Sequence, residues 1–213
     1  MNNNDLILIG GGGHCKSVID VAESAGYKII GILDTFDKVG TSVLNYPIIG
    51  VDDEIAKYKD KALFLITVGQ IADPSLRIKL HQKVIGVGGT LATIVASTAY
   101  VSKYATLGVG TIIMHHAMIN ANANIGSGCI INTFANVEHD TVIHDFCHIS
   151  TGVMVNGGCV VNEGTFLGSQ SVVSNGVFIT NECVISAGSF VRKNITQKGI
   201  YAGNPATLKK ANL

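Results

Sequence analysis

The chain has 213 residues, of which 47% are hydrophobic, and its 15 basic residues balance 15 acidic ones. A chain of this length can bury one large core or two small ones, and the lack of a basic surplus argues against nucleic acid as a partner. No apolar run approaches the length of a membrane span, and the first residues lack the pattern of a signal peptide, so we expect a cytoplasmic protein.

The N-terminal part has the pattern of a small Rossmann-like α/β domain. An apolar strand at 5–9 leads directly into Gly10–Gly13, and a helical pattern then runs from His14 to Gly26 before a second strand. A glycine-rich turn between strand and helix directs backbone N–H groups and a helix N-terminus at a phosphate. Cys15 stands where a dinucleotide fingerprint has its third glycine, so a nicotinamide or flavin cofactor is not expected.

Polar or small residues also follow the next strands. Asp34 ends the second strand, about twenty residues beyond the glycines, and Gly69 and Gln70 follow a third strand at 62–68. Ligands of open α/β sheets bind at the carboxyl edge, so the glycine turn, Asp34 and the Gly-Gln pair are expected to line one crevice. Asp34 can equally be a turn residue that only ends its strand.

The other elements expected in this domain are a short edge strand at 48–50 and helices at 52–59 and 75–84. Several glycines then lead into a different pattern. We therefore place a domain boundary there, with the Rossmann-like domain at 1–89 and a second domain at 90–213.

From Val95 to Val191 an aliphatic residue returns every six positions without interruption, and a small or modest side chain lies two residues before almost every one. Neither the period of a helix, about 3.6, nor that of a strand, 2, fits this spacing. A period of six is typical of a parallel β-helix, in which each flat face of a coil takes about six residues. The outward faces of such a rod suit self-association, and its ends need caps. Past Val191 the period fails, and 199–206 is expected to be a loop before a short basic tail.

A histidine flanked by two carboxylates is the strongest chemical feature of the rod. His139 lies between Glu138 and Asp140. A neutral histidine oriented by a carboxylate can accept a proton near neutral pH, as a general base must. A surface histidine without a function is the simpler interpretation. Because three titratable groups stand in a row on a charge-poor rod, we give this interpretation and that of a general base about equal weight.

Two other interpretations of the rod are open. His139 and His144 have the spacing of a zinc-binding pair in β-helix hydratases, but the third ligand would fall near position 103, which is Lys103, so we expect no metal. A rod that binds a nucleotide sugar without catalysis is the non-enzymatic alternative.

The chain resembles the bacterial hexapeptide-repeat sugar acyltransferases. More narrowly, it is similar to the sialic-acid O-acetyltransferases and the N-acetyltransferases of UDP-4-amino sugars of the bacillosamine type. The segments that carry this resemblance are 132–140, 148–150, 202–206 and 10–14. It implies a left-handed parallel β-helix, a homotrimer, acetyl-CoA as co-substrate, and a nucleotide sugar bound by the N-terminal domain.

The resemblance also implies roles for individual residues. His139 matches the general base, and Asp140 matches its supporting carboxylate, which is Glu in the bacillosamine enzyme. His148 matches a histidine near the thioester of acetyl-CoA. The other residues expected at acetyl-CoA are Gly157, Ala187, Gly203 and Asn204. The residues expected at the nucleotide sugar are Gly11, Gly12, Gly13, His14, Asp34, Gly69, Gln70 and Asn132.

Together these features predict direct acetyl transfer, without a covalent acyl-enzyme, to a nucleotide-linked amino sugar for bacterial glycan biosynthesis. The domain with the glycine turn favours a nucleotide-linked acceptor, and the resemblance implies one of the UDP-4-amino-4,6-dideoxy-N-acetylhexosamine type. O-acetylation of a sialic-acid-type sugar is the alternative.

Overall fold

The computed structural model describes residues 4–211, so the outermost residues of both predicted domains lie outside the described range. The chain divides into two compact units. The first takes the described residues up to Gly69 and the segment Ser75–Ser97, and the second takes Gln70–Pro74 and the described residues from Thr98 onward. The sequence-based boundary did not anticipate that residues 70–74 pack with the second unit.

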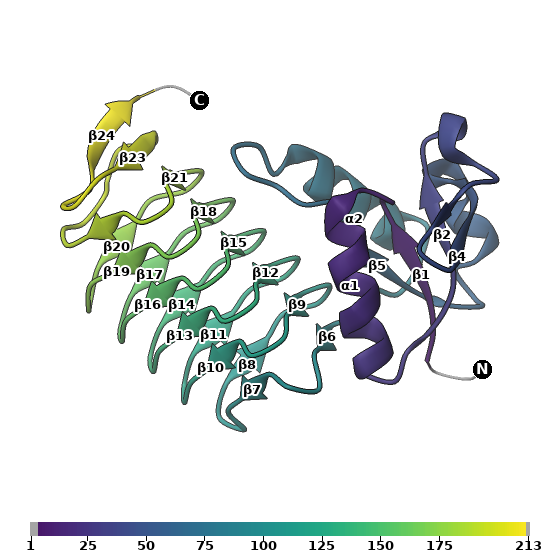
Figure 1. Ribbon diagram of the computed structural model, residues 1–213, viewed down its shortest axis with the longest axis horizontal. Helices are drawn as coiled ribbons and strands as arrows, with labels where there is room; N and C mark the ends of the chain where they lie inside the picture. The colour runs from purple at the N-terminus through teal and green to yellow at the C-terminus, as the bar shows by residue number, and fades with distance from the viewer. Residues whose placement is uncertain (1–3, 212–213) are drawn as a thin grey trace. The chain divides into compact units, whose positions relative to one another are not determined.

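The first unit is built on a sheet with strand order β3-β4-β2-β1-β5 (Figure 1). Strands β1, β2, β4 and β5 are parallel, and β3 pairs antiparallel with β4. The strands of this sheet are β1 (Asp5–Ile9), β2 (Lys28–Asp34), β3 (Ser42–Val43), β4 (Tyr46–Val51) and β5 (Leu63–Ile66). Strand β6 (Ile94–Val95) belongs to the same unit but not to this sheet. The helices are α1 (Gly13–Ser24) and α2 (Ser75–Gly86), with 3₁₀ turns η1 (Phe36–Lys38) and η2 (Asp52–Lys57).

This sheet exists because its strands are apolar on both faces, as parallel strands covered by helices must be. Ile7, Phe64 and Ile66 are buried in one cluster with Leu80 and Val84 of α2. The chain leaves β1 through a glycine at φ 104°, Gly10, where a β-carbon would lie 2.5 Å from the Val68 side chain. Only glycine fits that turn.

The second unit is a parallel β-helix, and Figure 1 shows its coils stacked one on the next. The first sheet contains β7 (Tyr100–Val101), β10 (Met118–Ile119), β13 (Asn136–Val137), β16 (Met154–Val155), β19 (Val172–Val173) and β22 (Phe190–Val191). The second sheet contains β8 (Thr106–Leu107), β11 (Asn124–Ile125), β14 (Val142–Ile143), β17 (Val160–Val161) and β20 (Phe178–Ile179). The third sheet includes β9 (Ile112–Ile113), β12 (Ile130–Ile131), β15 (His148–Ile149), β18 (Phe166–Leu167) and β21 (Val184–Ile185).

The six-residue period sets the register of these sheets. Ile119 pairs with Val137 and Val137 with Val155, so equivalent positions lie one coil, or three hexapeptides, apart. The repeating aliphatic side chains stack inside the prism, and those of Ile119, Val137 and Val155 are completely buried. The cysteines at 129, 147, 159 and 183 are also buried, in the small interior positions.

The end of the rod differs from the expected loop and tail. Strand β23 (Ile200–Ala202) pairs parallel with β21 and antiparallel with β24 (Thr207–Lys210). This hairpin adds backbone partners to the last coil, which would otherwise present an unpaired edge. Within residues 4–211, no helix is long and apolar enough to cross a membrane.

Candidate functional site

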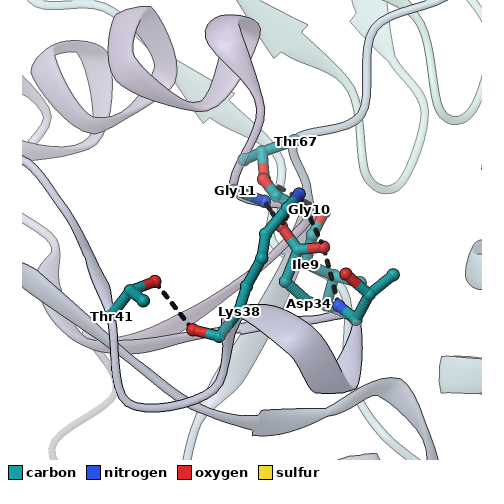
Figure 2. A network of polar contacts seen from close by, with 8 residues as sticks. Ile9, Gly10, Gly11, Asp34, Lys38, Thr41 and Thr67 are labelled. Atoms are coloured by element: carbon teal, nitrogen blue, oxygen red, sulfur yellow. Dashed lines mark hydrogen bonds and ion pairs between the residues drawn. The ribbon is translucent and has the colours of Figure 1, made fainter.

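The glycine turn of the first unit is held by Asp34, at the end of β2. The N–H of Gly11 donates to Asp34 Oδ2 at 2.6 Å and the N–H of Thr35 donates to Oδ1 at 2.7 Å. Lys38 Nζ donates to both oxygens, at 3.0 and 3.2 Å, as Figure 2 shows. Partial burial opposes ionisation, but the hydrogen bonds from Thr35, Lys38 and Gly11 outweigh it and lower the pKa of Asp34. The charged carboxylate therefore orders the turn, and its contact with a ribose stays a prediction.

The other predicted residues of the turn leave space for a ligand. A β-carbon on Gly12 or Gly13 would meet no atom within 4 Å, and Gly13 begins α1, where the first backbone N–H groups have no partner within the helix. A β-carbon on Gly69 would lie 3.6 Å from Cβ of His14. The predicted turn residues, Asp34 and Gly69 thus come together at the carboxyl edge of the sheet. An anion is the ligand that such a helix N-terminus favours.

A cavity of about 380 Å³ opens beside Asp34. Its lining comes from the carboxyl ends of β2 and β4 and from the turns after them: Asp34, Thr35, Phe36, Val51, Asp52 and Asp53. Phe36 is 86% exposed and presents a flat apolar surface. Neither Phe36 nor Lys38 was predicted, although both follow Asp34 closely in the sequence.

The described contacts of Gln70 are with the β-helix, and its predicted place in the crevice stays a prediction. The side-chain Nε2 of Gln70 donates to the backbone carbonyl of Phe146 at 2.6 Å. The backbone carbonyl of Gln70 accepts from His148 Nδ1 at 2.8 Å. Gln70 is buried and belongs to the second unit. The side-chain amide and the backbone carbonyl of Gln70 both bond with groups of the β-helix. Phe146 is 76 residues from Gln70 in the chain, so no local sequence pattern reveals this contact.

His148 is buried on the outer side of the third sheet, against Phe166, with ring centroids 5.2 Å apart. A carbonyl only accepts, so the contact with Gln70 places a proton on His148 Nδ1. Its Nε2 then accepts from Asn132 Nδ2 at 3.2 Å. A neutral His148 therefore has no proton left for a thioester oxygen, and such a contact would displace Asn132. The role of His148 at acetyl-CoA stays a prediction, and it requires that the thioester displace Asn132 from Nε2.

The predicted base lies at the corner between the first and second sheets. His139 Nδ1 lies 2.7 Å from Asp140 Oδ2, and Asp140 Oδ1 accepts from Asn122 Nδ2 at 2.7 Å. The hydrogen bond from Asn122, followed by that with His139, lowers the pKa of Asp140. With a proton on Nδ1, Nε2 of His139 is the basic nitrogen.

Gly157, one coil later, supports the same histidine. A β-carbon at Gly157 would lie 2.7 Å from Cε1 and 2.8 Å from Nε2 of His139, closer than real β-carbons approach other atoms. The structure thus places Gly157 beside the imidazole. Its predicted contact with acetyl-CoA stays a prediction.

Glu138, the other carboxylate beside His139, has different partners. Its two oxygens accept from Asn120 Nδ2 at 2.8 Å and from Asn136 Nδ2 at 2.9 Å. Those amides lower its pKa, the Asn136 contact first, against partial desolvation. Asp140 is therefore the carboxylate that orients His139, which the sequence alone left open.

The remaining residues predicted at acetyl-CoA lie near the end of the rod. The N–H of Gly203 donates to Ser189 Oγ at 3.2 Å, and Asn204 and Ala187 are exposed. A cavity of about 290 Å³ adjoins this segment, lined by Arg192, Lys193, Pro205, Ala206 and Thr207. Two basic side chains at a cavity suit a phosphate-bearing ligand.

One copy of the chain does not gather all these groups. His139 lies at the corner between the first and second sheets, whereas His148 lies on the third sheet, the opposite face of a triangular prism. Residues 4–211 contain no group of three or more His, Cys, Asp or Glu side chains that could hold a metal ion.

Comparisons with known proteins agree with this architecture. Residues 5–84 match the PglD N-terminal domain family. The acetyltransferase domain of PglB from Neisseria gonorrhoeae is 26% identical, with a TM-score of 0.90 over 97% of this chain and 100% of that one. An uncharacterised protein of Acanthamoeba polyphaga mimivirus is 35% identical over 121 residues, and the matched part of the chain spans only 23% of that curated relative's length.

The structure of PerB from Caulobacter crescentus, in complex with CoA and GDP-perosamine, is 32% identical, with a TM-score of 0.89 over 96% of this chain and 97% of that one. A variant of perosamine N-acetyltransferase from the same organism is 31% identical over 96% of both chains. With this identity over nearly the full length of both proteins, the chain belongs to the hexapeptide-repeat sugar N-acetyltransferase family.

Proposed function

We propose that the protein transfers the acetyl group of acetyl-CoA to the amine of a nucleotide-linked amino sugar, for bacterial glycan biosynthesis in the cytoplasm. The solved structures that it resembles support this, because they are described with acetyl coenzyme A or with CoA and GDP-perosamine. The acceptor we favour is a 4-amino-4,6-dideoxy sugar linked to a nucleoside diphosphate.

The observation that carries the proposal is the geometry around His139. Its Nδ1 is bound to Asp140 at 2.7 Å, and its basic Nε2 lies beside Gly157, where no side chain blocks it. The histidine is exposed, so an acceptor can reach it. A base held in this way contributes about 10²–10⁴-fold to a proton-transfer step.

The reaction is a direct transfer in which the sugar amine attacks the thioester carbonyl carbon. A carbon–nitrogen bond forms, Nε2 of His139 takes the proton from the amine, and the carbon–sulfur bond breaks. The imidazolium then returns its proton to the leaving thiolate. Asp140 stabilises the imidazolium and keeps the proton of Nδ1 in place.

The first unit supplies a nucleotide site in this proposal. The open positions at Gly12 and Gly13 and the start of α1 suit a diphosphate, and the cavity beside Asp34 suits a ribose or base. Phe36 offers an aromatic face on which a base can stack. Neither feature selects between uracil and guanine.

We further propose a homotrimer. The outward side chains of the first sheet include large apolar groups, with Tyr100 56%, Met118 43% and Met154 39% exposed. Because His139 and His148 lie on opposite sides of one prism, a cleft between neighbouring copies is the arrangement that can bring such groups to one acetyl-CoA.

The proposal is tested by thiol release from acetyl-CoA with a panel of acceptors. The panel contains UDP-4-amino-4,6-dideoxy-N-acetylhexosamine, GDP-perosamine, CMP-linked sialic acid and free sialic acid. We expect turnover with an amino sugar, and its loss in His139→Asn. Preference for a sialic acid by tenfold in kcat/KM would replace N-acetylation with O-acetylation, and no thiol release with any acceptor would refute the assignment.

A further inference from the structure

A column of residues with left-handed backbone runs along the corner that carries His139. Asn122, Asp140, Gly158 and Gly176 have φ values of 60°, 61°, 70° and 67°. They are spaced one coil apart, 18 residues, and backbone hydrogen bonds from Asp140, Gly158 and Gly176 to the preceding coil stack this corner. Glycine is the residue that adopts this conformation without strain, and Asn and Asp tolerate it. Two coils therefore use glycine where Asn122 and Asp140 carry polar side chains.

These two side chains form one chain of hydrogen bonds with the histidine. Asn122 Nδ2 donates to Asp140 Oδ1 at 2.7 Å, and Asp140 Oδ2 lies 2.7 Å from His139 Nδ1. Both oxygens of the carboxylate are thus engaged, one on each side. A carboxylate held at both oxygens has one orientation, and so does the imidazole bound to it.

Packing does not fix this pair. The side chains of His139 and Asp140 are 60% and 57% exposed, so few atoms restrict their rotation. Exposed ion pairs contribute little unless a network holds them. The amide of Asn122 is the next member of that network among the described residues.

We propose that Asn122 is a positioning residue that acts through Asp140 to hold His139 in its reactive orientation. This inference rests on the proposed function, since it assigns His139 as the base. Three successive coils then supply the site, with Asn122 in one, His139 and Asp140 in the next, and Gly157 in the third.

The stack at the same corner shows that this pairing is specific. Asn120, two residues earlier, donates to Glu138 at 2.8 Å and not to Asp140. Two amides of one coil thus serve two different carboxylates of the next. Of these two amides, that of Asn122 contacts the carboxylate bound to His139.

The substitution Asn122→Gly tests the proposal with the least change of backbone, because Gly158 and Gly176 occupy the same corner position. With the preferred amino sugar and saturating acetyl-CoA, we expect kcat to fall about 10-fold, the usual scale for a lost hydrogen bond to a charged group. The KM values of both substrates should stay within about twofold, because the binding residues are untouched.

Gln170→Gly is the matched control. Gln170 is exposed, has φ 57° and lies at a corner between the third and first sheets, away from His139. Like Asn122→Gly, it replaces an amide side chain by glycine at a position with left-handed backbone. Its kcat should equal that of the wild type.

A double-mutant cycle separates action through Asp140 from a general effect on the coil. Asp140→Gly alone should lower kcat more than Asn122→Gly, and adding Asn122→Gly to it should change nothing further. Additive losses would overturn the proposal, as would a wild-type kcat in Asn122→Gly. If wild type itself releases no thiol, the proposed function fails, whereas an active wild type and a dead His139→Asn with an unaffected Asn122→Gly refute only the role of Asn122.

Discussion

At the scale of single residues, the His139 imidazole occupies space that is open because residue 157 is glycine and has no side chain. Gly157→Ala should lower kcat at least 10-fold, because the new β-carbon would lie 2.7 Å from the ring and force it away from Asp140. The fold should persist, since the ring is exposed and can move. Steady-state kinetics and thermal unfolding of the purified variant measure the two effects.

The neighbouring substitution Gly158→Ala is expected to lower stability and to leave kcat unchanged. A β-carbon at Gly158 meets nothing within 4 Å, but φ is 70°, so alanine is strained by about 1 kcal/mol. Its melting temperature should fall while kcat stays near that of the wild type. If Gly157→Ala loses stability and keeps its turnover, the contact with His139 does not matter to the reaction.

Cys15 gives a residue-scale prediction on pH. Burial raises the pKa of its thiol to about 11, against a smaller opposing effect of a hydrogen bond with Thr67. Between about pH 9 and pH 11 the unfolded thiol loses its proton and the folded one keeps it, so stability falls as pH rises. In Cys15→Ala the loss of unfolding free energy at alkaline pH should be smaller than in the wild type. The difference should be on the order of 1 kcal/mol by about pH 10.5. Urea unfolding at pH 7.5 and 10.5 measures it, and equal losses in both proteins would contradict it.

How far sequence reasoning reaches differs among these residues. The pair of His139 and Asp140 is adjacent in the chain, and the sequence shows it directly. The contact between Asn122 and Asp140 was missed, yet the period of 18 residues per coil could have indicated it. The contact of Gln70 with His148 spans 78 residues and two different folding patterns, so no local signal announces it.

At the scale of elements, the turns around the strands are the parts that sequence predicts least well. The apolar stretch at 48–50 predicted a brief edge strand, but β4 runs over Tyr46–Val51, because pairing with β2 and β3 carries it through Pro47 and Gly50. Both residues are poor strand formers, which hides its length. The hairpin of β23 and β24 was hidden in the same way, by glycines and a proline between short strands.

The turn after β2 depends on the charge of Asp34. Its folded pKa is lowered, so the stability it contributes is present above the unfolded value of 3.8 and is lost as pH falls through the folded pKa. Asp34→Asn keeps an acceptor for Gly11 but loses the ion pair with Lys38. It should cost about 2 kcal/mol at pH 7 and less below pH 3.

Denaturant unfolding at both pH values measures this difference. Asp37→Asn is the control, because Asp37 lies in the same turn. A cost that is equal at pH 7 and below pH 3 would show that the charge of Asp34 does not support the turn.

At the scale of the whole molecule, the proposed acetyl transfer needs both units, one to bind the nucleotide and the other to supply the base. In the proposed function, the first unit binds the diphosphate at its glycine turn, and the rod carries the proposed base, His139. The resemblance of the whole chain to nucleotide-sugar N-acetyltransferases over 96% of its length explains why both patterns occur together. The motifs predicted this division, while the identity of the nucleotide depends on cavity contacts that no motif specifies.

The homotrimer can be tested through the first sheet. Met154→Glu places a charge among the exposed apolar side chains of that sheet, where burial against a neighbouring copy would cost several kcal/mol. We expect trimer in the wild type and mostly monomer in the variant at micromolar concentration, by light scattering. Turnover should fall with the trimer fraction, because one prism holds His139 and His148 on opposite sides.

Asn124→Glu is the control for that experiment, because Asn124 is an exposed polar residue of the second sheet. It adds the same charge to a face whose outward residues at this level are polar, Thr106 and Asn124. A trimer that resists Met154→Glu but separates with Asn124→Glu would assign the interface to the second sheet. An active monomer of either variant would contradict the shared site, because each rod would then complete the reaction with its own residues alone.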